Sequence, residues 1–308
     1  MKNAYLFSGQ GAQIVDMGKD LAEQYPSVQA FYDQAADILG YQPLDLTETQ
    51  LADTLYAQPA TVCLSLAIWQ ALPPATDEYV LGGFSLGEYA AFAAAGVFDT
   101  ESLLHLVAER ARLMSIASQT ASGKMYAVLG LEDQVIETVL AQTDYAGRVW
   151  PVNYNCPGQL VIAGSSEAAD AAAAELKASG AKRVLALQVS GAFHTPLMQP
   201  AAEALSRFAA ELNIQPPSCP LYSNGTALPL SASAAASFPG YLAQHMTGPV
   251  LWTQTITNMY NAGVRRFVEL GPGKTLRGLV QKILKGHDDV EILNIGTAAD
   301  LTDFLMRT

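Results

Sequence analysis

The segment that most constrains the fold is Gly83-Phe84-Ser85-Leu86-Gly87, which stands between a strand-like run, Tyr79–Gly83, and a helical run, Tyr89–Ala95. A G-x-S-x-G pattern in this position predicts a sharp strand-to-helix turn that exposes the serine hydroxyl, and its glycines relieve backbone crowding. The amide that follows, of Leu86, then points to where an oxyanion would form, beside the positive end of the helix. An ordinary glycine-rich turn is the alternative, but the strand–helix context favours Ser85 as a nucleophile.

Helical and strand-like runs alternate along the chain, which favours an α/β fold with a parallel sheet core. Residues 125–190 predict a different order, with two strand–helix units arranged around a hairpin. The predicted elements are Met125–Leu131, Glu132–Thr143, the hairpin Val149–Ser165 turning at Pro157-Gly158, Ser166–Ser179 and Lys182–Ser190. This β-α-β-β-α-β order is the ferredoxin-like pattern.

The G-x-S-x-G turn is typical of α/β-hydrolase sheets. We therefore expect a large α/β-hydrolase-like domain, residues 1–124 and 194–308, with a small ferredoxin-like domain, residues 125–193, inserted into it. After the insertion, Thr195 and Pro196 have the residue types of a helix N-cap and first helical position, and predict that a helix begins there.

Composition excludes several classes of protein. The 308 residues carry a net charge of −12, which argues against general nucleic-acid binding. No apolar run reaches the roughly 18–20 residues of a membrane span, and the N-terminus has no signal-peptide pattern. Three scattered cysteines, Cys63, Cys156 and Cys219, predict neither a disulfide framework nor a zinc site. A reducing, cytoplasmic setting and a monomeric state are expected.

Positive charge is concentrated in one segment. Before Arg110 the only basic residues are Lys2 and Lys19, whereas six lie between positions 265 and 285 against one acid, Glu269. These six are Arg265, Arg266, Lys274, Arg277, Lys282 and Lys285. An anionic partner could dock there. The alternative is a solvated helix face, and charge alone favours that alternative.

The chain has four histidines that could serve as a base for Ser85. His105 falls opposite the apolar stripe of its predicted helix, and His287 stands in an acidic loop, so both should be exposed. His245 precedes a Gly-Pro pair near a helix end, where it could line the cleft or cap the helix. His194 lies in a loop that follows a strand, which is where catalytic residues of α/β proteins gather. We expect His194 to be the base. The alternative is a histidine whose ring nitrogens are hydrogen-bonded within its own loop and have no catalytic role.

Arg110 is placed by helical spacing in the middle of an apolar stripe, whereas Arg112 points to solvent. The stripe consists of Leu103, Leu106, Val107 and Met114. A buried guanidinium is costly unless it meets an anion. It could pair with an internal carboxylate, or it could hold a carboxylate of the substrate through a bidentate fork. In the second case, the acyl donor bears a free carboxylate.

Six motifs spread over essentially the whole chain resemble those of one family. They are Gly9-Gln10-Gly11-Ala12-Gln13, Gln58-Pro59-Ala60, Gly83–Tyr89, Val152–Asn155 with Pro157–Gln159, Gly191–Met198 and Gly271–Lys274. The chain resembles the malonyl-CoA:acyl carrier protein transacylases of fatty-acid synthesis and the related acyltransferase domains of polyketide synthases. This resemblance implies malonyl-CoA and acyl carrier protein as partners, with no cofactor and no metal.

The resemblance implies a mechanism of acyl transfer in two stages. Ser85 would attack the malonyl thioester with His194 as general base, and the amides of Gln10 and Leu86 would form the oxyanion hole. A backbone carbonyl, in place of an aspartate, orients the histidine in this family, and Leu251 would supply it here. The phosphopantetheine thiol of the carrier would then take the acyl group from the serine in a ping-pong sequence.

Four residues are expected to bind the acyl group. By resemblance, Arg110 would clamp the malonyl carboxylate, and Asn153 would shape the site from the small domain. Phe193, directly before His194, accompanies malonyl selection in related domains, so we expect malonyl to be preferred over methylmalonyl; packing of its ring into the core between the two domains is the alternative. Met114, on the same helix face as Arg110, is the fourth candidate.

The sequence departs from the family pattern at three positions. Phe84 stands where the family usually has His, and His245 and Leu251 stand where many relatives have Gln and Gln or Arg. A serine esterase or thioesterase would share Ser85 and His194 but would need neither the buried arginine nor the inserted domain. A catalytically silent docking module is a further alternative, although no expected catalytic residue is lost.

Overall fold

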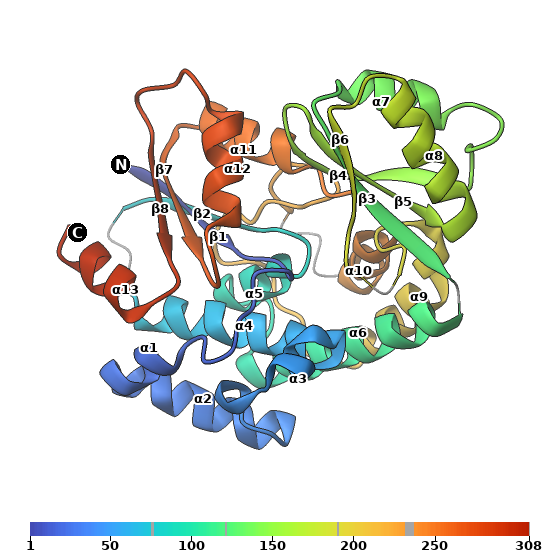
Figure 1. Ribbon diagram of the computed structural model, residues 1–308. Helices are drawn as coiled ribbons and strands as arrows, with labels where there is room; N and C mark the ends of the chain where they lie inside the picture. The colour runs from blue at the N-terminus through green and yellow to red at the C-terminus, as the bar shows by residue number, and fades with distance from the viewer. Residues whose placement is uncertain (75–76, 121, 190, 232–236, 308) are drawn as a thin grey trace.

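The computed structural model describes residues 1–74, 77–120, 122–189, 191–231 and 237–307. It contains two four-stranded sheets, one parallel and one antiparallel (Figure 1). The parallel sheet has the order β2-β1-β7-β8. Its strands are β1 (Lys2–Phe7), β2 (Tyr79–Gly83), β7 (Val264–Leu270) and β8 (Glu291–Ile295). The expected α/β class with a parallel sheet is thereby confirmed.

Helices pack against both faces of the parallel sheet and against one another, and most of the apolar core lies among them. They are α1 (Lys19–Gln24), α2 (Pro26–Leu39), α3 (Glu48–Ala52), α4 (Thr54–Ala71), α5 (Gly87–Ala94), α6 (Thr100–Thr120), α9 (Gln199–Ala210), α10 (Phe238–Thr247), α11 (Trp252–Asn261), α12 (Thr275–Ile283) and α13 (Ala298–Leu305), with 3-10 turns η1 (Pro43–Asp45) and η2 (Pro196–Met198). Helix α4 is apolar on all sides and almost wholly buried, as expected of a central helix. Thr195 caps η2 as predicted, because its hydroxyl accepts a hydrogen bond from Leu197 N.

The register of the parallel sheet brings two loops to the same edge. Strand β1 pairs with β2 so that Phe7 lies opposite Gly83, and Phe84 N donates to Phe7 O at 3.0 Å. The loop that contains Gln10 and the turn that contains Ser85 therefore leave neighbouring strands at their carboxyl ends. In open α/β sheets this edge is where ligands bind.

The second sheet is formed by β3 (Gly123–Leu129), β4 (Val149–Cys156), β5 (Gln159–Ser165) and β6 (Arg183–Ala186), in the order β4-β5-β3-β6. With α7 (Asp133–Leu140) and α8 (Ser166–Ala178), it follows the β-α-β-β-α-β order predicted from the sequence. The last strand ends earlier than predicted, and Ser190 lies outside the described residues. Residues 123–186 are called the antiparallel unit below. It has an apolar cluster of its own, which includes Val128, Ile136, Leu160 and Leu176.

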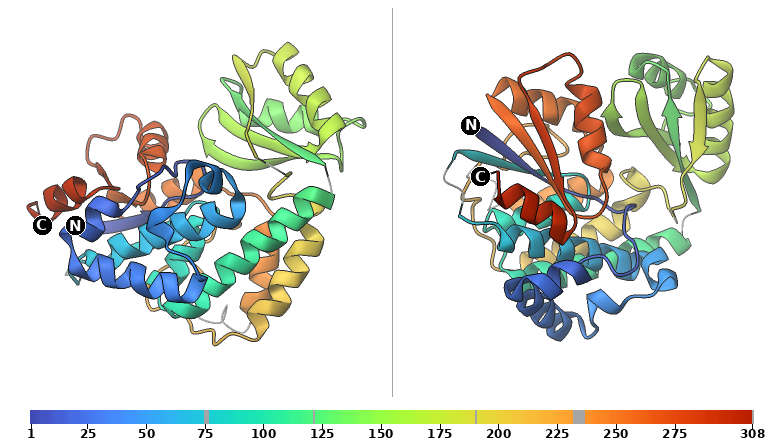
Figure 2. Two further views of the ribbon diagram at one scale, coloured as in Figure 1. Left: turned by 60° about the horizontal axis from the view of Figure 1, so that its bottom comes forward. Right: turned by 60° about the vertical axis from the view of Figure 1, so that its left-hand side comes forward.

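The antiparallel unit sits beside the parallel sheet and its helices in all three ribbon views (Figure 2). Its strand β4 is joined to the segment before α11 by backbone hydrogen bonds. Val250 N donates to Val152 O at 2.8 Å, and Tyr154 N donates to Val250 O at 3.0 Å. This pairing places Asn153 between the two parts of the molecule. Within the described residues, no helix is both long and apolar enough to cross a membrane.

Candidate active site

Ser85 occupies a strained turn directly after β2, with a φ of 51° in the left-handed region. The two glycines of the motif are required because neither position has room for a side chain. A Cβ at Gly83 would collide with the backbone of Gly87, and a Cβ at Gly87 would collide with the carbonyl of Phe7. Asn224 holds the turn from outside it: its Oδ1 accepts from Ser85 N at 2.7 Å, and its Nδ2 donates to Gly83 O at 2.6 Å.

His194 is hydrogen-bonded to the nucleophile. Its Nε2 lies 2.7 Å from Ser85 Oγ, and it has a φ of 61°. Its Nδ1 contacts the carbonyl oxygens of His245 at 3.2 Å and Gly248 at 3.1 Å. Because carbonyl oxygens only accept hydrogen bonds, Nδ1 carries the proton and Nε2 is free to accept the serine proton. This tautomer is the one that a general base needs.

The expectation that Leu251 supplies the orienting carbonyl is wrong. Leu251 is the N-cap of α11, so its carbonyl is already engaged by Thr255, whose amide lies 2.9 Å away. The two carbonyls that do face the imidazole come from the C-terminal end of α10, where the last carbonyls of a helix lack intrahelical partners. His194 therefore uses acceptors that α10 leaves available.

Burial dominates the electrostatics of His194, which is 6% exposed. Burial, followed by the nearby His245 and Arg110 side chains, lowers the pKa of His194 from 6.5 to about 3. The two backbone carbonyls act in the opposite direction but do not outweigh burial. The imidazole is consequently neutral at physiological pH and available as a base.

The predicted oxyanion-hole residues lie beside the nucleophile. Leu86 is the N-cap of α5, and Gln10 lies in the loop after β1. This loop is packed against the turn, since a Cβ at Gly9 would come within 2.7 Å of Phe84 O. Within the described part of the chain, neither the Gln10 nor the Leu86 amide donates a hydrogen bond. Both amides are thus available to an oxyanion formed at Ser85.

A pocket of about 470 Å³ brings together eight of the nine predicted site residues. They are Gln10, Ser85, Leu86, Arg110, Met114, Asn153, Phe193 and His194. Leu251 is not among the lining residues. The antiparallel unit contributes part of the wall, including Met125 and Val161. Of the three other histidines, His105 and His287 are exposed as expected, and His245 is buried and does not line the pocket.

Arg110 is 2% exposed and forms no ion pair with any carboxylate of the described residues. Its Nη1 donates to Gln58 Oε1, its guanidinium carbon lies 5.0 Å from the centre of the Tyr89 ring, and its Nε has no partner in the described structure. Burial lowers the pKa of Arg110, yet a guanidinium remains charged in proteins. The internal carboxylate considered as its partner is therefore not found, and the charge faces the pocket.

Three functional positions were not found by the sequence reasoning. Gln58 was noted only as part of a motif, but it orients Arg110 and also donates to Thr54 Oγ1 at 2.8 Å. Asn224 lies in a Ser-Asn-Gly stretch that predicts only a turn. Glu88, in the first turn of α5, is fully buried and accepts from Asn224 N at 2.9 Å. Its burial could not be inferred from an isolated acid in a short helix.

The model of the acyl transferase domain family matches residues 4–306. The chain belongs to this family. The malonyl CoA-acyl carrier protein transacylase of Haemophilus influenzae is 36% identical over 312 residues, covering 99% of each chain. The crystal structure of MCAT from Streptococcus pneumoniae is 38% identical, with a TM-score of 0.92 over 99% of this chain and 100% of that one. A malonyl-transacylase in complex with a type II PKS acyl-carrier protein is 34% identical, with a TM-score of 0.92 over 100% of both chains.

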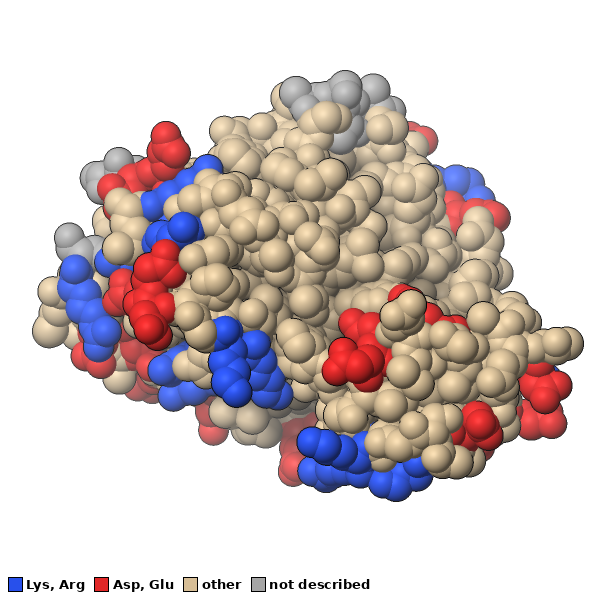
Figure 3. Space-filling view, turned by 90° about the horizontal axis from the view of Figure 1, so that it is seen from above, with Lys and Arg blue, Asp and Glu red and all other residues tan. Residues whose placement is uncertain are grey.

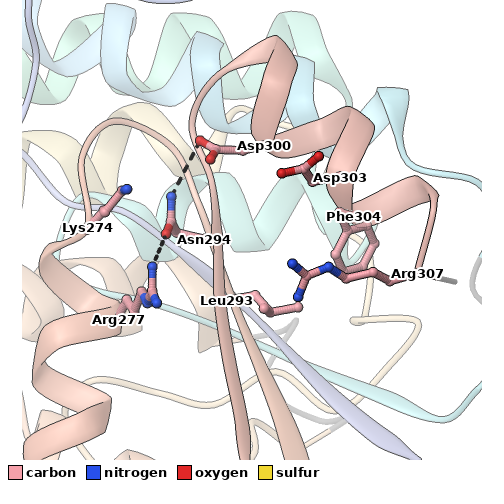
Figure 4. A pocket seen from close by; sticks show the side chains of 8 residues that line it. All are labelled: Lys274, Arg277, Leu293, Asn294, Asp300, Asp303, Phe304 and Arg307. Carbon is pink, nitrogen blue, oxygen red and sulfur yellow. Dashed lines mark hydrogen bonds between the residues drawn. The ribbon is translucent and has the colours of Figure 1, made fainter.

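This acyl transferase domain has a second cavity, of about 230 Å³, that shares no lining residue with the active-site pocket. It lies between α12, β8 and α13 (Figure 4). Arg277 Nη1 donates to Asn294 Oδ1 at 3.0 Å there, and Asn294 Nδ2 donates to Asp300 Oδ2 at 3.5 Å. Lys274 lines the same cavity. Part of the basic segment is thus directed toward this mixed-charge cavity.

Proposed function

We propose that this chain is an S-malonyltransferase, which moves a malonyl group from malonyl-CoA to the phosphopantetheine thiol of an acyl carrier protein. The observation that carries the proposal is a buried Arg110, unpaired with any carboxylate of the described residues, in the same pocket as a Ser85–His194 pair hydrogen-bonded at 2.7 Å. A serine acyl-transfer site with a fixed positive charge suits an acyl donor that bears a carboxylate. The names of the relatives reported above agree with this assignment.

The geometry of the pocket supports the following proposed reaction. Ser85 Oγ attacks the thioester carbonyl while His194 Nε2 takes its proton, and the Gln10 and Leu86 amides stabilise the oxyanion. The carbon–sulfur bond then breaks, and CoA leaves as a thiol with the proton from His194. In the second half, the carrier thiol gives its proton to His194 and attacks malonyl-Ser85. Collapse of that intermediate returns the proton to Ser85 and releases the malonyl-carrier.

The experiment is intact-mass analysis after mixing the protein with malonyl-CoA, with and without holo-carrier protein. The expected result is one malonyl adduct on Ser85, which disappears when the carrier is added and reappears on the carrier. Ser85→Ala and an apo-carrier that lacks the thiol are the matched controls. Absence of an adduct on Ser85 under single-turnover conditions contradicts the mechanism, and free malonate as the product favours a hydrolase.

The proposal extends to the organisation of the chain. Residues 1–124 and 194–308 would form the large catalytic domain, and residues 125–193 the small ferredoxin-like domain. The separate apolar cluster of the antiparallel unit supports this division. A cytoplasmic location is proposed on the basis of three free cysteines, of which Cys63 and Cys156 are buried.

The carrier or the CoA phosphates are proposed to dock on the basic segment formed by Lys274, Arg277, Lys282 and Lys285. The one acid of this region, Glu269, is buried and accepts from the first amides of α12, so it does not offset the surface charge. Lys282 Nζ lies 3.4 Å from Gln159 Oε1 of the antiparallel unit, which places this lysine where α12 meets that unit. Figure 3 shows several Lys and Arg side chains gathered on the left half of the upper face, interspersed with acids.

A further inference from the structure

A buried pair of side chains, Glu88 and His245, lies behind the active-site pocket and lines none of it. Glu88 is 0% exposed and His245 is 5% exposed. The distance between Glu88 Oε2 and His245 Nε2 is 3.5 Å. Among the described residues, no lysine or arginine pairs with Glu88. A buried carboxylate needs compensating contacts, and the imidazole of His245 is the nitrogen-bearing side chain that faces it in the ion-pair geometry.

Glu88 is connected to the nucleophile through Asn224. Glu88 Oε2 accepts from Asn224 N at 2.9 Å, and the Asn224 side chain in turn holds Ser85 N at 2.7 Å. The other carboxylate oxygen accepts from the hydroxyl of Tyr241, on α10. Glu88 therefore joins the turn that carries the nucleophile to the helix that carries His245.

His245 is connected to the base through its own backbone. Its carbonyl oxygen lies 3.2 Å from His194 Nδ1, while its side chain faces Glu88. Its ring packs edge-on against the ring of His194, with centres 5.8 Å apart, and against the ring of Tyr89, with centres 5.4 Å apart. Because this interior is closely packed, we expect a shift of the His245 side chain to displace the carbonyl that orients the base.

These contacts form a continuous series behind the catalytic pair, from Ser85 through Asn224, Glu88 and His245 to His194. We propose that the His245–Glu88 pair is a positioning device. It holds the His245 carbonyl, which orients His194, in a fixed place relative to Ser85. The inference rests on the proposed acyl transfer. Because neither residue contacts the pocket, loss of the pair should lower the rate of Ser85 acylation and leave the KM for malonyl-CoA unchanged.

The test compares His245→Leu, His245→Gln and wild type by the single-turnover rate of Ser85 acylation, the KM for malonyl-CoA and the melting temperature. A glutamine amide can still donate to Glu88, whereas leucine cannot. We expect leucine to lower the acylation rate by at least about tenfold, as for the removal of one partner of a buried charged group. Glutamine should recover most of that loss, with KM within about twofold in both variants.

A second comparison keeps the inference testable if His245→Leu does not fold. His245→Asn carries the same amide as His245→Gln on a shorter side chain, which cannot reach Glu88 from the same backbone position. The glutamine variant should therefore acylate faster than the asparagine variant. His287→Leu, at an exposed histidine, is the control and should behave as wild type.

Three outcomes overturn the inference. They are a wild-type acylation rate in His245→Leu, a fall in melting temperature without any fall in rate, and equal rates in the glutamine and asparagine variants. Failure of the wild-type protein to form malonyl-Ser85 is a different result. That result would remove the proposed function itself.

Discussion

Ser85 and His194, joined by a 2.7 Å hydrogen bond, are both held in the left-handed region of the backbone, with φ of 51° and 61°. Neither is glycine, so each position costs conformational energy, of order 1–3 kcal/mol. Asn224 holds Ser85 in this conformation by binding its amide, and the carbonyls of α10 hold the ring of His194. The strained backbone aims both side chains at the same point of the pocket.

Ser85→Gly should be more stable than Ser85→Ala by about 1 kcal/mol, because only the alanine variant retains the left-handed strain. Both variants lose the hydroxyl, so chemical denaturation of the two isolates the backbone contribution. Ser115→Gly and Ser115→Ala, at a position inside α6, are the control variants. There the order should reverse, with alanine more stable than glycine by about 0.5–1 kcal/mol. Equal stability of the two Ser85 variants would mean that the turn is unstrained.

Arg110→Ala should weaken malonyl transfer far more than acetyl transfer. A hydrogen bond to a charged group contributes on the order of 1.5–3 kcal/mol, or roughly 10–150-fold in kcat/KM. Arg112→Ala is the matched control on the same helix, since Arg112 is exposed and paired with Glu109 at 2.7 Å. Equal losses for the two acyl groups would indicate that Arg110 serves the fold alone.

His194 should make the protein less stable as the pH falls below about 6.5. Its pKa is about 3 in the folded state, so between these values the unfolded chain binds a proton at this residue that the folded chain does not. Above the ordinary pKa of histidine, titration of this residue leaves the free energy of unfolding unchanged. Below it, the free energy of unfolding falls toward acid, with a slope of at most about 1.4 kcal/mol per pH unit. Urea denaturation of wild type and His194→Gln across this range should give a shallower decline in the variant. Identical slopes would contradict the assigned pKa.

Phe193→Ser should narrow the preference for malonyl over methylmalonyl, which we expect to be roughly 10–200-fold in kcat/KM. Phe193 lines the pocket beside the base and is 9% exposed, so its ring limits space at the malonyl C2. The ratio should fall because methylmalonyl is admitted, with malonyl transfer largely retained. Phe193→Leu keeps an apolar side chain, so its ratio of malonyl to methylmalonyl transfer should lie between those of wild type and Phe193→Ser. If wild type transfers both acyl groups equally, or the serine variant unfolds, Phe193 is not a gate.

Charge reversal in the basic segment should raise the KM for the carrier and flatten its dependence on salt. Lys282→Glu and Lys285→Glu change exposed residues at the end of α12, whereas Lys274→Glu and Arg277→Glu change the cavity beside α13. Arg207→Glu, an exposed residue on α9 away from α12 in Figure 1, carries the same change in net charge as a control. Unchanged carrier kinetics in all four variants would leave the segment as a solvated surface.

The sequence by itself determined the features that depend on local spacing. A serine between two glycines, after a strand and before a helix, specifies the exposed turn, because side chains larger than hydrogen collide at Gly83 and Gly87. Helical periodicity placed Arg110 among apolar neighbours and Arg112 in solvent, and both positions hold in the structure. The β-α-β-β-α-β order of the antiparallel unit was likewise predictable from alternating periodicity.

Only the tertiary structure decided which groups hold the catalytic pair. The base is oriented by the carbonyls of His245 and Gly248, and every residue has a carbonyl, so side-chain identity carries no signal for this role. Asn224 binds the nucleophile across 139 positions of sequence, and the pairing of Glu88 with His245 depends on α5 and α10 packing together. Such contacts are invisible to local patterns, because they arise when segments distant in sequence are brought together by burial of the core.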